Sequence, residues 1–210
     1  VAEGGAINGV RCDVGVPRDV ERLVEESRLN DTDVDVVHFV NAAGMVTKNA
    51  PLCDVDADEI VSAVNANLIG PLLCARAVMR LAKENANSRT RYVVWNFGFS
   101  DWGANLSRSA STHKSTKSGL STLTKALNAE VKSLSATRPG MKCEFHQLSP
   151  GLALTKLLLG NGNANPVSKK VFNALAEEPE DIARALAAAM IKVPEGSTTP
   201  VEYLTPIDAV

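Results

Sequence analysis

Short apolar runs recur along the chain, and each ends at small or turn-forming residues. Three of them predict strands, over Val34–Val40, Tyr92–Phe97 and Lys142–Leu148. The first is rich in β-branched residues, which indicates a strand that is buried on both faces of a parallel sheet. A weaker run, Val10–Val14, is a candidate for a fourth strand.

Longer segments with apolar residues three and four positions apart separate these runs. They predict helices over Asp19–Arg28, Ala110–Ala136 and Pro179–Val193, and two consecutive helices within Ala57–Lys83. Strands that alternate with helices are typical of the doubly wound α/β fold, in which helices cover both faces of a parallel sheet. No repeat or linker divides the sequence, so we expect a single domain over residues 1–210.

The composition excludes several classes of partner. Hydrophobic residues make up 45% of the chain and charged residues 22%, as in an ordinary globular protein. The 22 Lys and Arg residues nearly balance the 24 Asp and Glu residues, and aromatic residues reach only 4%, which disfavours nucleic acid as a partner. No uninterrupted apolar run approaches the ~20 residues of a membrane-spanning helix, so we expect no transmembrane segment.

Cysteine and histidine spacing gives no metal-ligand pattern. The sequence has four widely separated cysteines, Cys12, Cys53, Cys74 and Cys143. Their positions within apolar patterns favour small buried hydrophobic residues in a reducing, intracellular location over a zinc site or a disulfide framework. His38 and His146 lie within predicted strands, where we expect core residues.

Small and polar residues follow each of the three predicted strands. They are Asn41–Gly44 after the first strand, Gly98–Asp101 after the second and Ser149–Gly151 after the third. Ordinary turn chemistry explains any one of these loops alone. In an open parallel sheet, however, ligands bind beyond the carboxyl ends of the strands. Three such loops at consecutive strand ends favour a polar ligand that lies across the sheet edge.

A histidine and a lysine share one face of the predicted helix over Ala110–Ala136. His113 and Lys117 are four residues apart, so their side chains lie one helical turn from each other. A lysine on a helix is most often a solvated charge. Leu120 and Ser121, which follow Lys117 on its face, are apolar and small, an unusual setting for a residue that serves only solubility.

Together, in this order, the motifs resemble those of the short-chain dehydrogenase/reductase family, from Asp13 to the C-terminus. The loop Asn41–Gly44 resembles the family's loop beside the adenine ring, and Pro150-Gly151 with Thr155 resembles the segment that holds the nicotinamide. The resemblance implies a Rossmann-like fold with an NAD(P) cofactor. It places the cofactor on Asp13, Asn41, Ala42, Gly44, Lys117, Pro150, Gly151 and Thr155.

The resemblance also implies catalytic roles. Asn67 matches the asparagine that organises a proton-relay water, Ser100 the substrate-orienting serine, and Lys117 the lysine of the family's Tyr-x-x-x-Lys pair. His113 stands where the family has its tyrosine, 13 residues after Ser100. An imidazole can act as a general acid or base near neutral pH, but it is shorter than a phenol, and the nearby lysine disfavours its protonated form.

Within the family, the sequence is most similar to the chlorophyll(ide) b reductases of plastids, from Leu148 to Leu158 and near the C-terminus. This similarity implies reduction of a pigment carbonyl in the chloroplast. The family also implies a homo-oligomer or a subunit of a larger assembly.

The family's glycine-rich turn, which receives the cofactor pyrophosphate at a helix N-terminus, has no counterpart here. Gly4, Gly5 and Gly9 precede no helical pattern. We therefore expect an N-terminally incomplete domain that lacks the family's first strand–helix–strand unit. Three hypotheses remain open: an NAD(P)-dependent oxidoreductase that uses His113, a non-catalytic scaffold in a larger assembly, and a shortened chain of an active enzyme.

Overall fold

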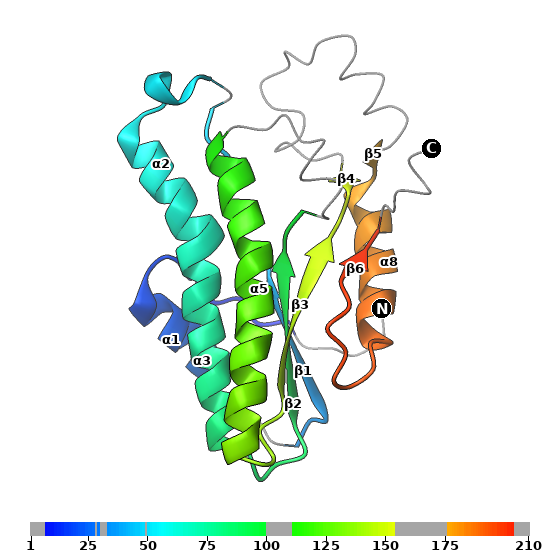
Figure 1. Ribbon diagram of the computed structural model, residues 1–210. Coiled ribbons are helices and arrows are strands. Elements are labelled where there is room, and N and C mark those ends of the chain that lie inside the picture. The colour runs from blue at the N-terminus through cyan, green and yellow to red at the C-terminus, as the bar shows by residue number, and fades with distance from the viewer. Residues whose placement is uncertain are drawn as a thin grey trace.

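The computed structural model describes residues 7–27, 29, 33–48, 50–99, 111–153 and 176–203. Its centre is a parallel sheet in the order β1-β2-β3-β6 (Figure 1). The strands are β1 (Val36–Asn41), β2 (Arg91–Phe97), β3 (Cys143–Ser149) and β6 (Val201–Glu202). A separate parallel pair joins β4 (Leu152–Ala153) to β5 (Ala176–Glu177). This arrangement confirms the α/β class that the sequence predicts.

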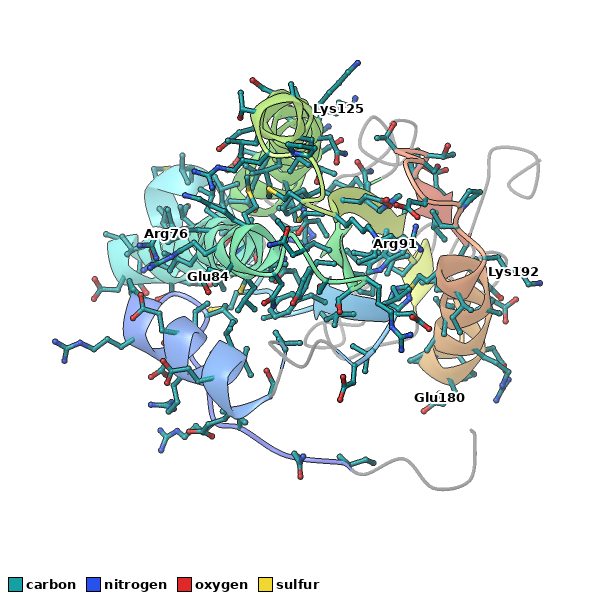
Figure 2. All side chains as sticks on the ribbon, turned by 90° about the horizontal axis from the view of Figure 1, so that it is seen from below. Arg76, Glu84, Arg91, Lys125, Glu180 and Lys192 are labelled. Atoms are coloured by element: carbon teal, nitrogen blue, oxygen red, sulfur yellow. The ribbon has the colours of Figure 1, made fainter. Side chains whose placement is uncertain are left out.

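Helices cover the sheet on both faces (Figure 2). On one face, α2 (Ala57–Val64), a π-helical turn (Asn65–Ile69) and α3 (Gly70–Glu84) follow one another and lie beside α5 (Ser111–Thr137). The helix α8 (Pro179–Ile191) lies on the other face of the sheet. The helix α1 (Pro17–Glu26) packs against α3, on the side away from α5. A short 3-10 turn (Leu52–Asp54) precedes α2.

Two clusters of apolar side chains hold these layers together. Between the sheet and the pair α3 and α5, Val78, Val94 and Phe145 are fully buried. Beneath α8, Trp95 and Leu148 are buried against two residues of that helix, Ile182 and Leu186. Burying a large apolar side chain stabilises the fold by about 1.5–3 kcal/mol, so these two clusters fix the strands on which the loops of the sheet edge are mounted.

Two expectations about strands were wrong. Val10–Val14 forms no strand: Cys12 packs on the cluster of α1 and α3, and Val14 lies against Gly70, so both are partly covered without strand pairing. The strand β1 is not buried on both faces. Val36 and Val40 are 37% and 41% exposed, and His38 is exposed with them, because α8 covers β2 and β3 but not this face of the edge strand β1.

The four cysteines differ in exposure, and Cys12 is intermediate. Cys74 and Cys143 are buried, as expected, and burial raises the pKa of each thiol to about 12. Cys53 is exposed, which corrects the expectation of a core residue, because it lies in the short 3-10 turn ahead of α2. Among the described residues, no group of His, Cys, Asp or Glu side chains could hold a metal ion.

By length and composition alone, the helical stretch Ala57–Glu84 could cross a membrane. Its α3 part nevertheless packs into the core, where Cys74, Ala75 and Val78 are buried against α1, α5 and the sheet. Core helices commonly pass such a test, so the stretch is weak evidence for a membrane span.

Candidate active site

The carboxyl ends of β1, β2 and β3 meet at one edge of the sheet, because the three strands are parallel and in register. The loops that begin at Ala42, Gly98 and Pro150 therefore start at the same edge (Figure 1). The π-helical turn and the first turns of α5 border this edge as well. The fold thus brings together the loops that the sequence pattern singles out.

Lys117 lies in the second turn of α5 and reaches the end of β2. Its Nζ donates a hydrogen bond to the carbonyl oxygen of Phe97 at 2.7 Å. A Cβ atom on Gly44 would lie only 3.7 Å from Nζ, so the loop after β1 also approaches the ammonium closely. Burial lowers the pKa of Lys117 from 10.5 to about 8. The group is therefore protonated at neutral pH but gives up its proton more readily than a surface lysine.

His113 lies one turn before Lys117 and is half-buried. Burial lowers the pKa of His113, and the positive charge of Lys117 lowers it further. The Met45 backbone acts in the opposite direction and raises the pKa. Nδ1 is buried and has no hydrogen-bond partner among the described residues. The ring of Phe99 meets the imidazole edge-on, with centroids 5.3 Å apart. A buried, unpartnered ring nitrogen is costly, and it is suited to a ligand or a water.

Asn67 lies in the π-helical turn and joins the loop after β1 to α5. Its Oδ1 accepts a hydrogen bond from the Met45 N–H at 2.8 Å, and its Nδ2 donates to the Met45 carbonyl at 2.8 Å and to Thr116 Oγ1 at 3.1 Å. Since a Cβ on Gly44 would come within 3.1 Å of Oδ1, glycine suits this close approach. Single π-helical turns are frequent at functional sites.

Three buried threonines, which the sequence analysis missed, fix the start of α5. Thr116 Oγ1 donates to the Thr112 carbonyl at 2.8 Å, and the hydroxyls of Thr112 and Thr47 lie 2.6 Å apart. Thr112 and Thr116 precede His113 and Lys117 by one position each. Their spacing of four residues was the available signal, but only the fold reveals that they face the loop after β1.

The comparisons with known proteins agree with this arrangement. A family model described as enoyl-(acyl carrier protein) reductase, adh_short_C2, matches residues 1–191. The chain belongs to the short-chain dehydrogenase/reductase family. Its structure is also similar to that of 3-ketoacyl-(acyl-carrier-protein) reductase from Brucella melitensis complexed with NADH, at a TM-score of 0.72 and 24% identity. That match covers 92% of this chain and 75% of the other, and it confirms the Rossmann-like fold.

Two plant members of the family are more similar in sequence. The chain is 31% identical over 198 residues to "Probable chlorophyll(ide) b reductase NYC1, chloroplastic" of Oryza sativa subsp. japonica, which covers 94% of this chain and 36% of that protein. It is 30% identical over 210 residues to "Chlorophyll(ide) b reductase NOL, chloroplastic" of Arabidopsis thaliana, which covers 98% of this chain and 58% of that protein. The chain therefore spans less than two thirds of the length of each of these relatives.

In this member of the short-chain dehydrogenase/reductase family, a small cavity of about 70 Å³ lies beside the loop after β1. Ala42 and Ala43 line it opposite Val14, the neighbour of Asp13. Asp13 itself turns back on its own backbone, since its Oδ1 accepts a hydrogen bond from the Gly15 N–H at 2.9 Å. Asn41 is buried, and its Nδ2 donates to Asn96 Oδ1 at 2.8 Å. Asn41 thus joins two strand ends, and Ala42 and Gly44 remain exposed.

The segment after β3 turns sharply. Gly151 has a φ of +68°, a left-handed conformation that favours glycine, and it directs the chain from β3 into β4. Pro150 is half-buried beside it. Two predicted site residues, Ser100 and Thr155, lie outside the described residues. Of the predicted catalytic residues that are described, Asn67, His113 and Lys117 lie together at the edge of the sheet where β1, β2 and β3 end.

Proposed function

We propose that this chain carries the carbonyl-reducing site of an NAD(P)H-dependent reductase, with His113 in the role of the proton donor. The observation that carries the proposal is the pair on α5: Lys117, held against the Phe97 carbonyl, and His113 one turn away with an unpartnered Nδ1. Each group has a pKa lowered by burial, and perturbed pKa values that cluster at a sheet edge are typical of catalytic sites.

The residues fit a nicotinamide cofactor on the side of the reacting atoms. Gly44 leaves no Cβ between the loop and Lys117, so a polar ligand can approach the ammonium. Lys117 would hold the ribose hydroxyls of the cofactor, and Pro150-Gly151 would border the nicotinamide ring. When bound, the cofactor supplies a hydride to the carbonyl carbon of the substrate.

His113 would then complete the reduction. As hydride reaches the carbon, the carbonyl oxygen gains negative charge and takes a proton from the protonated imidazole, which leaves an alcohol and a neutral His113. The charge of Lys117 favours the anionic oxygen and the departure of the proton. For the substrate, we propose an aldehyde on a chlorophyll b-type pigment, in keeping with the names of the plant relatives, and a chloroplast location.

The pH dependence of the reaction tests this role. Burial and the charge of Lys117 lower the pKa of His113, so the imidazole is less protonated at neutral pH than a free histidine side chain. The rate of NADPH-dependent aldehyde reduction should rise as the pH falls through this lowered pKa, and alcohol oxidation should rise in the opposite direction. A reduction rate that is flat between pH 5 and 7 in the folded protein would remove His113 from the mechanism.

A second candidate, a non-catalytic scaffold on the same fold, is favoured by the same lowered pKa, since a neutral imidazole is a poor acid. Titration with NADPH separates the two. Cofactor binding with aldehyde turnover supports the reductase, whereas a folded chain that neither binds NADPH nor turns over supports the scaffold. In the scaffold case, a His113→Tyr variant that gains both activities would indicate a site that has lost its acid.

We also propose that two copies associate through α2, α3 and α5. Val61 and Leu72 are 57% and 39% exposed, and Leu72 lines a groove of about 340 Å³ between α3 and α5. Sedimentation equilibrium should give a dimer, and Leu72→Glu should give a monomer. A wild-type monomer at micromolar concentration would refute this association.

A further inference from the structure

A buried glutamine lies behind the candidate active site. Gln147 is on β3, two positions before the strand ends, and its side chain bridges α5 and the loop after β2. The Oε1 atom accepts a hydrogen bond from Ser121 Oγ at 2.6 Å. The Nε2 atom donates to the carbonyl oxygen of Phe99. Both ends of the amide are therefore used, and the side chain is 7% exposed.

Gly98 lies beside this side chain. A Cβ atom at position 98 would meet Cγ and Cδ of Gln147 at 3.4 Å, an ordinary van der Waals distance, so the side chain packs beside the end of β2. The Gly98 N–H donates to the Leu148 carbonyl at 3.0 Å. With Lys117 on the carbonyl of Phe97, three consecutive residues at the end of β2 are held by three different partners.

Phe99 carries this constraint to His113. Its ring meets the imidazole at an interplanar angle of 85° with centroids 5.3 Å apart. The Met45 backbone also acts on the imidazole, and the ring of Phe99 is a second neighbour that restrains its orientation. The position of Phe99 depends in turn on the amide of Gln147.

We propose that Gln147, anchored by Ser121, is a positioning residue that orients the imidazole of His113 through Phe99. The residue contacts neither the imidazole nor, in the proposed function, any reacting atom. Its effect on turnover rests on that proposed function, whereas its effect on the imidazole does not. Misplacing a catalytic group by about 1 Å can cost on the order of 100-fold in rate, so a support of this kind matters.

The test compares Gln147→Leu with a matched control, Asn128→Leu. Asn128 also extends from α5 to β3 and makes two hydrogen bonds to its backbone, at 2.6 Å and 2.9 Å to Phe145. Both of these hydrogen bonds go to Phe145, and neither joins Asn128 to Phe99. The chain has three histidines, so a His113→Gln variant identifies the His113 imidazole resonance in a carbon–proton NMR spectrum.

Gln147→Leu should move the His113 resonance and its titration midpoint, as should Phe99→Leu. The double variant should show no further change, because both substitutions break one path. Asn128→Leu should lower the melting temperature and leave the resonance in place. In the active reductase, Gln147→Leu should reduce kcat on the order of 10- to 100-fold while the KM for NADPH stays constant.

A folded Gln147→Leu protein with an unmoved His113 resonance would overturn the proposal. If that variant does not fold, Ser121→Ala can be compared with the wild type instead. It removes only the hydroxyl that donates a hydrogen bond to Gln147 Oε1. Should the wild type lack aldehyde reduction altogether, the proposed function fails, yet the resonance still decides whether Gln147 positions His113.

Discussion

Two histidines on opposite sides of the sheet show what distinguishes a structural imidazole from a candidate catalytic one. His146 is fully buried under α8, stacks on Trp95 at 4.6 Å, and lies 3.3 Å from Glu144 Oε2 and 3.4 Å from the Thr199 carbonyl. His113 is less buried, yet its Nδ1 has no partner among the described residues. The more deeply buried ring has its polar atoms satisfied, and the shallower ring does not. Partnering of the ring nitrogens, and not depth of burial, separates the two sites.

The largest effect should come from removing each imidazole and measuring aldehyde reduction per folded molecule. His113→Ala should lower kcat by roughly 10²- to 10⁴-fold, the usual contribution of a general acid, with little loss of stability. His146→Ala should leave kcat within about threefold, since the ring stacks on Trp95 beneath α8, on the opposite face of the sheet from His113. Equal losses of kcat in the two variants would show that the comparison of the two rings is mistaken.

The sequence predicted the sheet and the main helices well, because each has a strong local signature. β2 begins one residue before the predicted run, and β3 begins and ends one residue after the predicted run. By contrast, β6 has only two residues, which is too short for a periodic pattern. The expected strand at Val10–Val14 failed because an apolar run shows that residues are covered, not which partner covers them.

The candidate site was predictable only as far as motif residues define it. His113 and Lys117 are one helical turn apart in any helix, so their juxtaposition follows from spacing. The contacts of Gln147 with Ser121 and Phe99 join residues that are 26 and 48 positions apart, and no local pattern encodes them. The same reason explains why His38 and His146 looked alike in sequence, although only His146 is a core residue.

The second largest effect is on the free energy of unfolding, when the buried and hydrogen-bonded ring of His146 is removed. His146→Ala removes a fully buried side chain that stacks on Trp95, and it leaves a cavity beneath α8. The free energy of unfolding should fall by about 3 kcal/mol, as for other large-to-small substitutions in a core. Urea denaturation followed by Trp fluorescence measures this change. A loss under about 0.5 kcal/mol would mean that the region relaxes around the missing ring.

In the candidate active site, removing a buried polar group should stabilise the fold instead of destabilising it. Lys117 has a pKa of about 8 in the folded chain against 10.5 otherwise, so its ammonium destabilises the fold at neutral pH. Lys117→Met removes this cost and the hydrogen bond to Phe97, and it should stabilise the chain by about 2 kcal/mol at pH 7, because each pKa unit is worth about 1.4 kcal/mol. Turnover should be lost at the same time.

The pH dependence of stability provides a control for this assignment. A group whose pKa is lower in the folded state favours folding as the pH rises above that lowered value. The wild type should therefore gain stability between about pH 8 and pH 10.5, and Lys117→Met should lack this gain. If urea midpoints of the two proteins rise in parallel over this range, the ammonium is not buried in solution.

The smallest predicted effect comes from Glu144, whose carboxylate lies against the His146 ring. Burial alone would raise the pKa of Glu144, but hydrogen bonds from His146 and the Gly196 N–H, together with the charge of Arg91, outweigh it and lower the pKa below 4.5. The carboxylate therefore stabilises the fold above its unfolded pKa, and this contribution disappears as the pH falls through the lowered value.

Glu144→Gln should reduce the free energy of unfolding by about 1 kcal/mol at pH 7, and it should make stability depend less steeply on pH in the acid range. Thermal melts from pH 3 to 7 measure both, with Asp181→Asn, at an exposed carboxylate on α8, as the matched control. An acid limb of the stability curve that Glu144→Gln leaves as steep as in the wild type would mean that His146 is held by its stacking on Trp95 and not by its contact with Glu144.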